Sequence, residues 1–141
     1  MKTLLACGIA AAAIAIASPA LRAHHAFAAE FDAAQPITLR GTVTRVEWIN
    51  PHTWIHINVK DGDGKTTEWM IEGGTPNTLL RRGVDKNSIP AGTEIIVDGY
   101  RAKNGSNRAN GRDLTLPNGK KLFVGSSGTG APTDGKDPAE K

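Results

Sequence analysis

Apolar and polar residues alternate along several short stretches of the chain, which is the pattern of strands that bury one face. Residues 53–59 alternate most regularly, and residues 66–72 repeat the pattern after an Asp-Gly-Asp-Gly turn. Antiparallel pairing of Ile57 with Trp69 and of Ile55 with Ile71 gathers the apolar side chains on one face. The two stretches therefore predict a hairpin with one face in a hydrophobic core.

The same register predicts the composition of the other face of this hairpin. It sets Trp54 opposite Glu72 and His56 opposite Met70, with His56 facing solvent. The exposed tryptophan makes this outer face the first candidate for a binding surface.

Residues 38–49 form another alternating stretch, in which the apolar phase changes between Val43 and Val46. Such a change of phase predicts a β-bulge, since one extra residue moves the side chains that follow to the opposite face. Three further strands are predicted over residues 94–100, 108–116 and 121–124.

Residues 75–83 predict a short helix with signals at both ends. Thr75 suits the N-cap, Pro76 suits the first helical position, and Gly83 suits the left-handed position after the last turn. Leu79 and Leu80 are expected to plug one end of a barrel.

The elements follow one another as three strands, a helix and further strands, which is the order of the OB-fold. We therefore expect an all-β fold, a small five- to six-stranded OB-like Greek-key barrel with one short helix between strands 3 and 4. In that fold the binding groove comprises the face of strands 2 and 3 and the loops that join strands 1–2 and 4–5.

Residues 1–23 have the layout of a secretory signal peptide, with a basic start, an apolar run and small residues around Pro19. The run over residues 4–17 is shorter than a membrane span requires. Cleavage is expected after Ala20 or Ala23. The mature protein is then expected in the periplasm or outside the cell, without a membrane span and without Cys7.

The rest of the chain is expected to form one domain over residues 24–125, followed by a disordered tail over residues 126–141. Residues 24–36 form an N-terminal arm, in which Phe27 and Phe31 are spaced for one helical turn that ends at Pro36. The net charge is +3 for the whole chain, and residues 24–72 are acidic whereas residues 73–125 are mildly basic. The chain has no polybasic arm, so strong nucleic-acid binding is not expected.

Two short motifs are distinctive. Residues 24–32 read His-His-Ala-Phe-Ala-Ala-Glu-Phe-Asp, and residues 48–52 read Trp-Ile-Asn-Pro-His. Together they resemble a family of small exported bacterial proteins of unknown function. The resemblance runs from His24 to about Gly125 and implies an exported single domain, but it implies no activity and no functional residue.

The first functional hypothesis is a non-enzymatic module that binds a small molecule or an envelope protein. Its site combines the outer face of strands 2 and 3 with the Asn-Pro-His corner and nearby cations. The ligand-binding candidates are Asn50, His52, Trp54, His56, Arg101, Lys103 and Arg108. A sugar or base would stack on the tryptophan, and the cations would hold an anionic group. In the alternative interpretation, Trp54 packs under the arm that carries Phe27 and Phe31.

The second hypothesis is a metal-binding protein, with copper as the ion. If His24 is the first mature residue, its amine and its ring nitrogen form a clamp for copper, to which imidazole is well suited. The metal-ligand candidates are His24, His25, His52, His56 and Met70. His52 and His56 lie about 13 Å apart along an extended strand, so they share an ion only if the turn folds back. Otherwise His52 bonds the turn backbone and His56 is exposed.

An enzymatic activity is not expected. Glu47, Glu68 and Glu72 lack a spacing that indicates an acid–base pair, and the chain has neither a nucleophile elbow nor a glycine-rich phosphate loop. Apart from copper in the second hypothesis, the sequence points to no cofactor.

Overall fold

The computed structural model describes residues 26–126 and 129–132. The elements, in chain order, are β1 (Phe31–Glu47), β2 (Trp54–Lys60), β3 (Thr66–Glu72), α3 (Pro76–Arg81), β4 (Glu94–Ala102), β5 (Arg108–Thr115) and β6 (Lys121–Phe123). A helical turn over residues 26–30 precedes β1. The predicted signal peptide, the two N-terminal histidines and the end of the tail lie outside the described residues. In the described part, no helix has the length and hydrophobicity of a membrane span.

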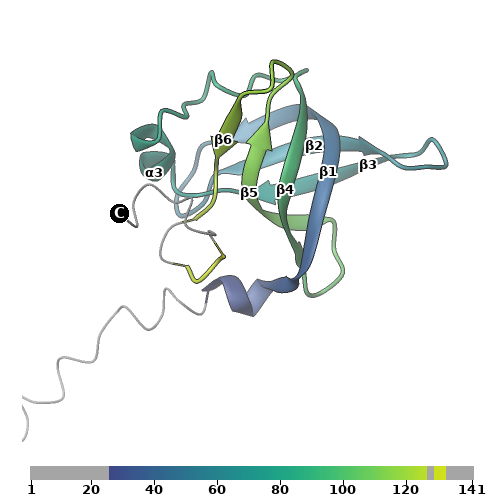
Figure 1. Cartoon of the computed structure of the whole chain (residues 1–141), viewed down its shortest axis with the longest axis horizontal. Coiled ribbons are helices and arrows are strands. Elements are labelled where there is room, and N and C mark those ends of the chain that lie inside the picture. Colours follow the sequence, from purple (N-terminus) through teal and green to yellow (C-terminus); the bar gives the residue numbers. More distant parts are fainter. Residues whose placement is uncertain (1–25, 127–128, 133–141) are drawn as a thin grey trace, which may run out of the picture.

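Five strands close into a ring (Figure 1). The order β3-β2-β1-β4-β5 is antiparallel throughout, and a parallel pairing of β3 with β5 completes the circle. The short β6 continues the sheet beside β5. The predicted small all-β barrel with a helix between its third and fourth strands is therefore confirmed.

The predicted register of the β2–β3 hairpin is also confirmed. Ile57 pairs with Trp69 and Ile55 with Ile71. All four side chains are buried, with Trp69 the most exposed at 6 %. Burial of a large aliphatic or aromatic side chain contributes about 1.5–3 kcal/mol, so these positions fix the face that turns inward.

The predicted bulge lies in β1, where the pairing with β2 shifts between Val43 and Arg45. A bulge bends its strand and increases the local twist. β1 can therefore pair with β4 over its first part and with β2 over its second part, which a straight strand in a small ring could not do.

β1 begins earlier than the sequence predicts. The helical turn covers residues 26–30 only, and Phe31 already pairs with Ala102 of β4. Pro36 does not end an arm but lies within the strand, at a position where the register with β4 shifts. A proline lacks the N–H that a regular ladder needs, and such an irregularity accommodates it.

The helix has the predicted caps, but only one of its two leucines is buried. The Thr75 hydroxyl accepts a hydrogen bond from the Thr78 backbone N–H, and Gly83 has a φ of 77°. Leu79 is fully buried, whereas Leu80 is 55 % exposed. The prediction that both leucines plug the barrel is wrong for Leu80, because adjacent positions of a single helical turn point in different directions.

The predicted disordered tail is wrong for its first residues. Ser126 is buried, and its hydroxyl donates a hydrogen bond to the Gly73 carbonyl at 3.2 Å. The Phe27 N–H donates to the Thr129 carbonyl at 3.2 Å. Composition alone could not predict these contacts, since they depend on which parts of the barrel lie beside the chain.

Candidate functional site

The corner between β1 and β2 is held by backbone hydrogen bonds to the segment after β3. The Thr53 N–H donates to the Gly74 carbonyl at 3.0 Å, and the Gly73 N–H donates to the Thr53 carbonyl at 2.8 Å. Asn50 and Pro51 are exposed, and the peptide bond between them is cis. The corner thus presents its tip to solvent while its returning chain is fixed beside the end of β3.

Glu72, the last residue of β3, places a buried carboxyl at the base of this corner. It is 7 % exposed, and Asn110 Nδ2 of β5 donates a hydrogen bond to its Oε1 at 3.2 Å. His52 Nδ1 lies 3.6 Å from the same oxygen, which is beyond hydrogen-bond range. This nitrogen has no hydrogen-bond partner among the described residues, so it does not make the predicted bond to the turn backbone.

Burial raises the pKa of Glu72 above its ordinary value of 4.5, because the desolvated site penalises the carboxylate. The charge of His52 is the largest opposing effect, and Asn110 and Arg108 also lower the pKa, whereas the negative charge of Glu30 raises it. A carboxyl perturbed by burial inside a polar cluster is a candidate functional group.

Trp54 lies opposite Glu72 on the outer face of the barrel, as the register predicts. It is half-buried, and the guanidinium of Arg108 lies 4.8 Å from the centre of its ring, a cation–π contact. Arg108 is also 3.2 Å from Glu30 Oε2, and its buried Nε has no hydrogen-bond partner in the described part of the chain. Arg108 therefore links the tryptophan to the segment that precedes β1.

The two phenylalanines of the N-terminal segment pack away from Trp54. The rings of Phe27 and Phe31 are 5.9 Å apart, and Phe27 meets the edge of Tyr100 at 5.5 Å. With Ala102 they form a separate small hydrophobic cluster. The alternative in which Trp54 packs under this segment is therefore not observed.

Two of the predicted cations make internal contacts instead of joining the corner. The Arg101 guanidinium lies 5.3 Å from the centre of the Trp69 ring. Lys103 Nζ donates a hydrogen bond to the Ala28 carbonyl. Of the cations in the predicted set, only Arg108 contacts Trp54.

The structure thus brings three predicted ligand-binding residues, His52, Trp54 and Arg108, together with side chains that the prediction omitted. The omitted side chains are Glu30, Glu72 and Asn110. The register of the β2–β3 hairpin already placed Glu72 beside Trp54, so this residue could have been included. No sequence pattern indicated Asn110, because this residue lies beside Glu72 only through the parallel pairing of β5 with β3.

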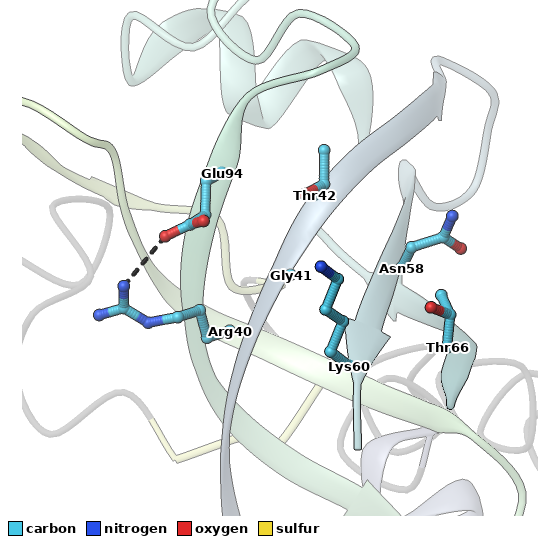
Figure 2. A pocket seen from close by; sticks show the side chains of 7 residues that line it. All are labelled: Arg40, Gly41, Thr42, Asn58, Lys60, Thr66 and Glu94. Carbon is cyan, nitrogen blue, oxygen red and sulfur yellow. Dashed lines mark hydrogen bonds and ion pairs between the residues drawn. The ribbon is translucent and has the colours of Figure 1, made fainter. Parts of the chain in front are cut away.

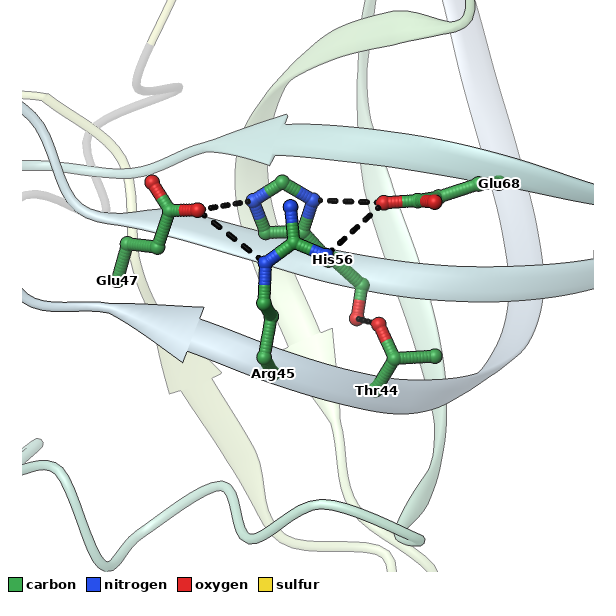
Figure 3. A network of polar contacts seen from close by, with 5 residues as sticks. All are labelled: Thr44, Arg45, Glu47, His56 and Glu68. Atoms are coloured by element: carbon green, nitrogen blue, oxygen red, sulfur yellow. Dashed lines mark hydrogen bonds and ion pairs between the residues drawn. The ribbon is translucent and has the colours of Figure 1, made fainter.

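His56 is buried, so the prediction that it faces solvent is wrong. Its side chain is 1 % exposed, with Nε2 3.1 Å from Glu47 Oε1 and Nδ1 3.0 Å from Glu68 Oε1 (Figure 3). Arg45 lies within 3.2 and 3.4 Å of the same two carboxylates. Long side chains from the neighbouring strands fold over the imidazole, which alternation cannot predict. A carboxylate oxygen lies beside each ring nitrogen, and the contact between Nδ1 and Glu68 is a hydrogen bond, whereas the contact between Nε2 and Glu47 is not.

This geometry bears on which of the candidate residues could bind a metal ion. The residues that the structure describes contain no cluster of three or more His, Cys, Asp or Glu side chains that could hold a metal ion. Met70 pairs with His56 on β2 and with Arg108 on β5. His24 and His25 lie outside the described residues. Within the described part, His52 Nδ1 and His56 Nε2 have no hydrogen-bond partner, and His56 Nε2 lies 3.1 Å from Glu47 Oε1.

The sequence matches a family described as "Family of unknown function (DUF6152)" over residues 11–111. The chain belongs to this family. No curated protein and no solved structure matches it. Within this DUF6152 chain, the matched region spans the corner, the β2–β3 hairpin and the first residues of β5. It therefore contains Trp54, Glu72 and Arg108.

As a chemical environment, the corner combines an aromatic ring, a buried carboxyl and an imidazole nitrogen with unused hydrogen-bonding capacity. Binding a polar group here would complete hydrogen bonds that the protein itself leaves unmade. These groups lie next to one another at the base of the corner.

Proposed function

We propose that this DUF6152 protein is an exported, non-enzymatic binding module, with its ligand site at the corner formed by His52, Trp54, Glu72, Arg108 and Asn110. One observation carries the proposal. The buried Glu72 carboxyl has a single hydrogen bond, at 3.2 Å, and the neighbouring His52 Nδ1 has none within the described residues. Buried polar groups are normally hydrogen-bonded. The Glu72 carboxyl and His52 Nδ1 can therefore form hydrogen bonds with a ligand.

The ligand class follows from the groups that remain free. Arg101 and Lys103 are engaged on Trp69 and on a backbone carbonyl, and two carboxyl groups, Glu30 and Glu72, lie around the remaining cation. An anion is therefore a poor fit. A small sugar or amine supplies the N–H or O–H donors that Glu72 and His52 can accept, and its apolar edge can lie against Trp54. Oligosaccharide binding at the corresponding face is a known use of OB-type barrels.

A titration followed by ¹H–¹⁵N NMR tests the proposal with three probes: glucose, putrescine and benzoate. We expect glucose or putrescine to shift the amide signals of His52, Trp54 and Asn110, and we expect benzoate to leave them unchanged. Trp54→Ala should abolish the shifts, whereas Thr66→Ala, at the other end of the β2–β3 hairpin, should preserve them. Shifts confined to other parts of the barrel, or equal losses in both variants, would contradict this assignment.

A second candidate function, copper binding, is favoured by the approach of His52 Nδ1 to Glu72 Oε1 at 3.6 Å. Two ligands of one metal ion lie at a comparable separation, and His24 would add an amine and an imidazole nitrogen if it begins the mature chain. Calorimetry with Cu(II) distinguishes the candidates. Tight binding by protein that starts at His24, and not by protein with one added residue, would favour copper. Weak binding by both forms is the result expected if the ligand is a sugar or amine.

A further inference from the structure

A cavity of about 410 Å³ lies on the outside of the barrel, away from the corner site. Its lining comes from four strands, and Figure 2 shows the side chains of Arg40, Thr42, Asn58, Lys60, Thr66 and Glu94 around it. The Lys60 side chain lies beside β1 near Gly41. None of these residues belongs to the corner.

The strand register explains why these side chains converge. Thr42 pairs with Asn58 across β1 and β2, and Lys60 pairs with Thr66 across β2 and β3. Thr42 also pairs with Glu94 on the other side of β1. Directly opposed residues on one face lie about 4.5–5.5 Å apart, so the polar groups are held in fixed positions by rigid elements.

Lys60 differs from the other basic residues of this region in its charge partners. In the acidic part of the chain, three of the four basic residues have carboxylate partners: Arg40 with Glu94, Arg45 with Glu47 and Glu68, and Lys65 with Asp63. Lys60 has no carboxylate partner among the described residues. An ammonium without a counter-ion, held over a polar cavity, attracts an anion.

The neutral side chains of the cavity are exposed and can donate hydrogen bonds to a ligand. The hydroxyls of Thr42 and Thr66 and the amide of Asn58 make no side-chain hydrogen bond to the described residues. Arg40 can also contribute, because its ion pair with Glu94 at 2.9 Å is on the surface, with the two side chains 67 % and 60 % exposed. Such exposed pairs add little stability, so the guanidinium can turn toward a ligand at small cost.

We propose that this cavity is a second binding site, which takes a small molecule that carries a phosphate or sulfate group. Lys60 supplies a point charge, Arg40 supplies a planar fork suited to an oxyanion, and Thr42, Asn58 and Thr66 supply neutral donors. The site is independent of the corner, so one can bind its ligand without the other.

Titration of inorganic phosphate at constant ionic strength, followed by ¹H–¹⁵N NMR, tests the site. Phosphate should shift the amide signals of Thr42, Asn58 and Thr66 and leave those of His52 and Trp54 in place. Lys60→Gln should weaken the apparent affinity by about tenfold, because it removes a charge-assisted contact. Lys121→Gln removes an exposed lysine on β6 and serves as the matched control, with the affinity expected to stay unchanged.

Further ligands in the same assay define the chemistry. Sulfate should behave like phosphate, and acetate should bind more weakly because it offers fewer oxygens. Glycerol phosphate and vesicles that contain phosphatidic acid distinguish a soluble ester from a lipid headgroup, and binding of either supports the oxyanion site. Equal weakening by the two lysine variants, or shifts of the same size with chloride, would mean non-specific attraction to surface charge and would overturn the proposal.

Discussion

Glu72 is the residue whose chemistry most affects the corner, because its carboxyl is buried beside His52 and Asn110. Burial raises its pKa above 4.5, so the folded state holds the proton more tightly than the unfolded state does. Stability contributed by the protonated carboxyl is fully present below the ordinary pKa. It is lost as the pH rises from that value through the raised pKa.

The upward shift of the Glu72 pKa gives the first prediction. Replacing Glu72 by Gln keeps an acceptor for Asn110 and removes the ionisation, so the variant should gain stability relative to the wild type as the pH increases. Urea unfolding at several values between about pH 4 and pH 7 measures the difference. Comparison with the wild type cancels the opposite contribution of exposed carboxyls such as Asp32, whose pKa is lowered by its hydrogen bonds to Ala34 and Gln35.

Glu94→Gln is the control for this prediction, since it neutralises an exposed carboxylate that is not part of the corner. The stability difference between Glu72→Gln and the wild type should grow with pH more steeply than the difference measured for this control. If the Glu72 variant shows no steeper growth, the buried carboxyl does not titrate differently in the folded protein, and the account of the corner is wrong.

His56 supports a second prediction at this scale. The imidazole is 1 % exposed and lies between Glu47 and Glu68. His56→Ala should destabilise the fold by about 2–3 kcal/mol, because two carboxylates lose a close partner. Asn58→Ala, on the same face of β2 but exposed, should change stability by no more than about 0.5 kcal/mol. Equal unfolding midpoints for the two variants would show that the contacts of His56 with Glu47 and Glu68 do not stabilise the fold.

Individual residues also show which features of the site could be predicted from the sequence. Alternation predicted the cross-strand pairs of the hairpin correctly, including Trp54 with Glu72 and His56 with Met70. It could not predict that His56 is covered, since the cover is made by side chains of other strands. Nor could it separate Arg108, which reaches Trp54, from Arg101 and Lys103, which point to other partners.

At the scale of the elements, helix α3 was the easiest to predict because its signals are local. Thr75 caps its start, and Gly83 lies just beyond its end. Its contact with the barrel gives a further prediction. Leu79→Ala should cost about 2–5 kcal/mol, since the fully buried side chain leaves a cavity. Leu80→Ala should cost no more than about 0.5 kcal/mol.

Thermal or urea unfolding of the two leucine variants measures this contrast, and the adjacent position provides the matched control. A large loss at Leu80 would mean that its exposed surface is covered, and a small loss at Leu79 would mean that the helix does not close the barrel as described.

At this scale, the sequence did not allow the parallel pairing of β3 with β5 to be predicted. Periodicity shows which face of a strand is buried, but it does not show which distant strand lies beside it. This pairing aligns Met70 with Arg108 and Glu72 with Asn110. It therefore assembles most of the candidate site, and the site could be predicted only for the residues that the hairpin and the corner already contain.

At the scale of the whole molecule, the order of elements was enough to predict the small barrel, since three strands, a helix and further strands have few compact arrangements. The ring carries two polar surfaces at opposite ends of the β2–β3 hairpin: the corner around Glu72 and the cavity around Lys60. Because they share no residue, variants in one should leave binding at the other intact, which makes the two proposals separable.

Native mass spectrometry of the protein purified from its source cells tests the central claim most directly. We expect a mature chain that begins after Ala20 or Ala23 and carries a small sugar or amine. This added mass should be absent from the Trp54→Ala and Glu72→Gln variants and retained in Lys60→Gln. A chain without an added mass, or an added mass that persists in both corner variants, would contradict the claim that the corner is the binding site.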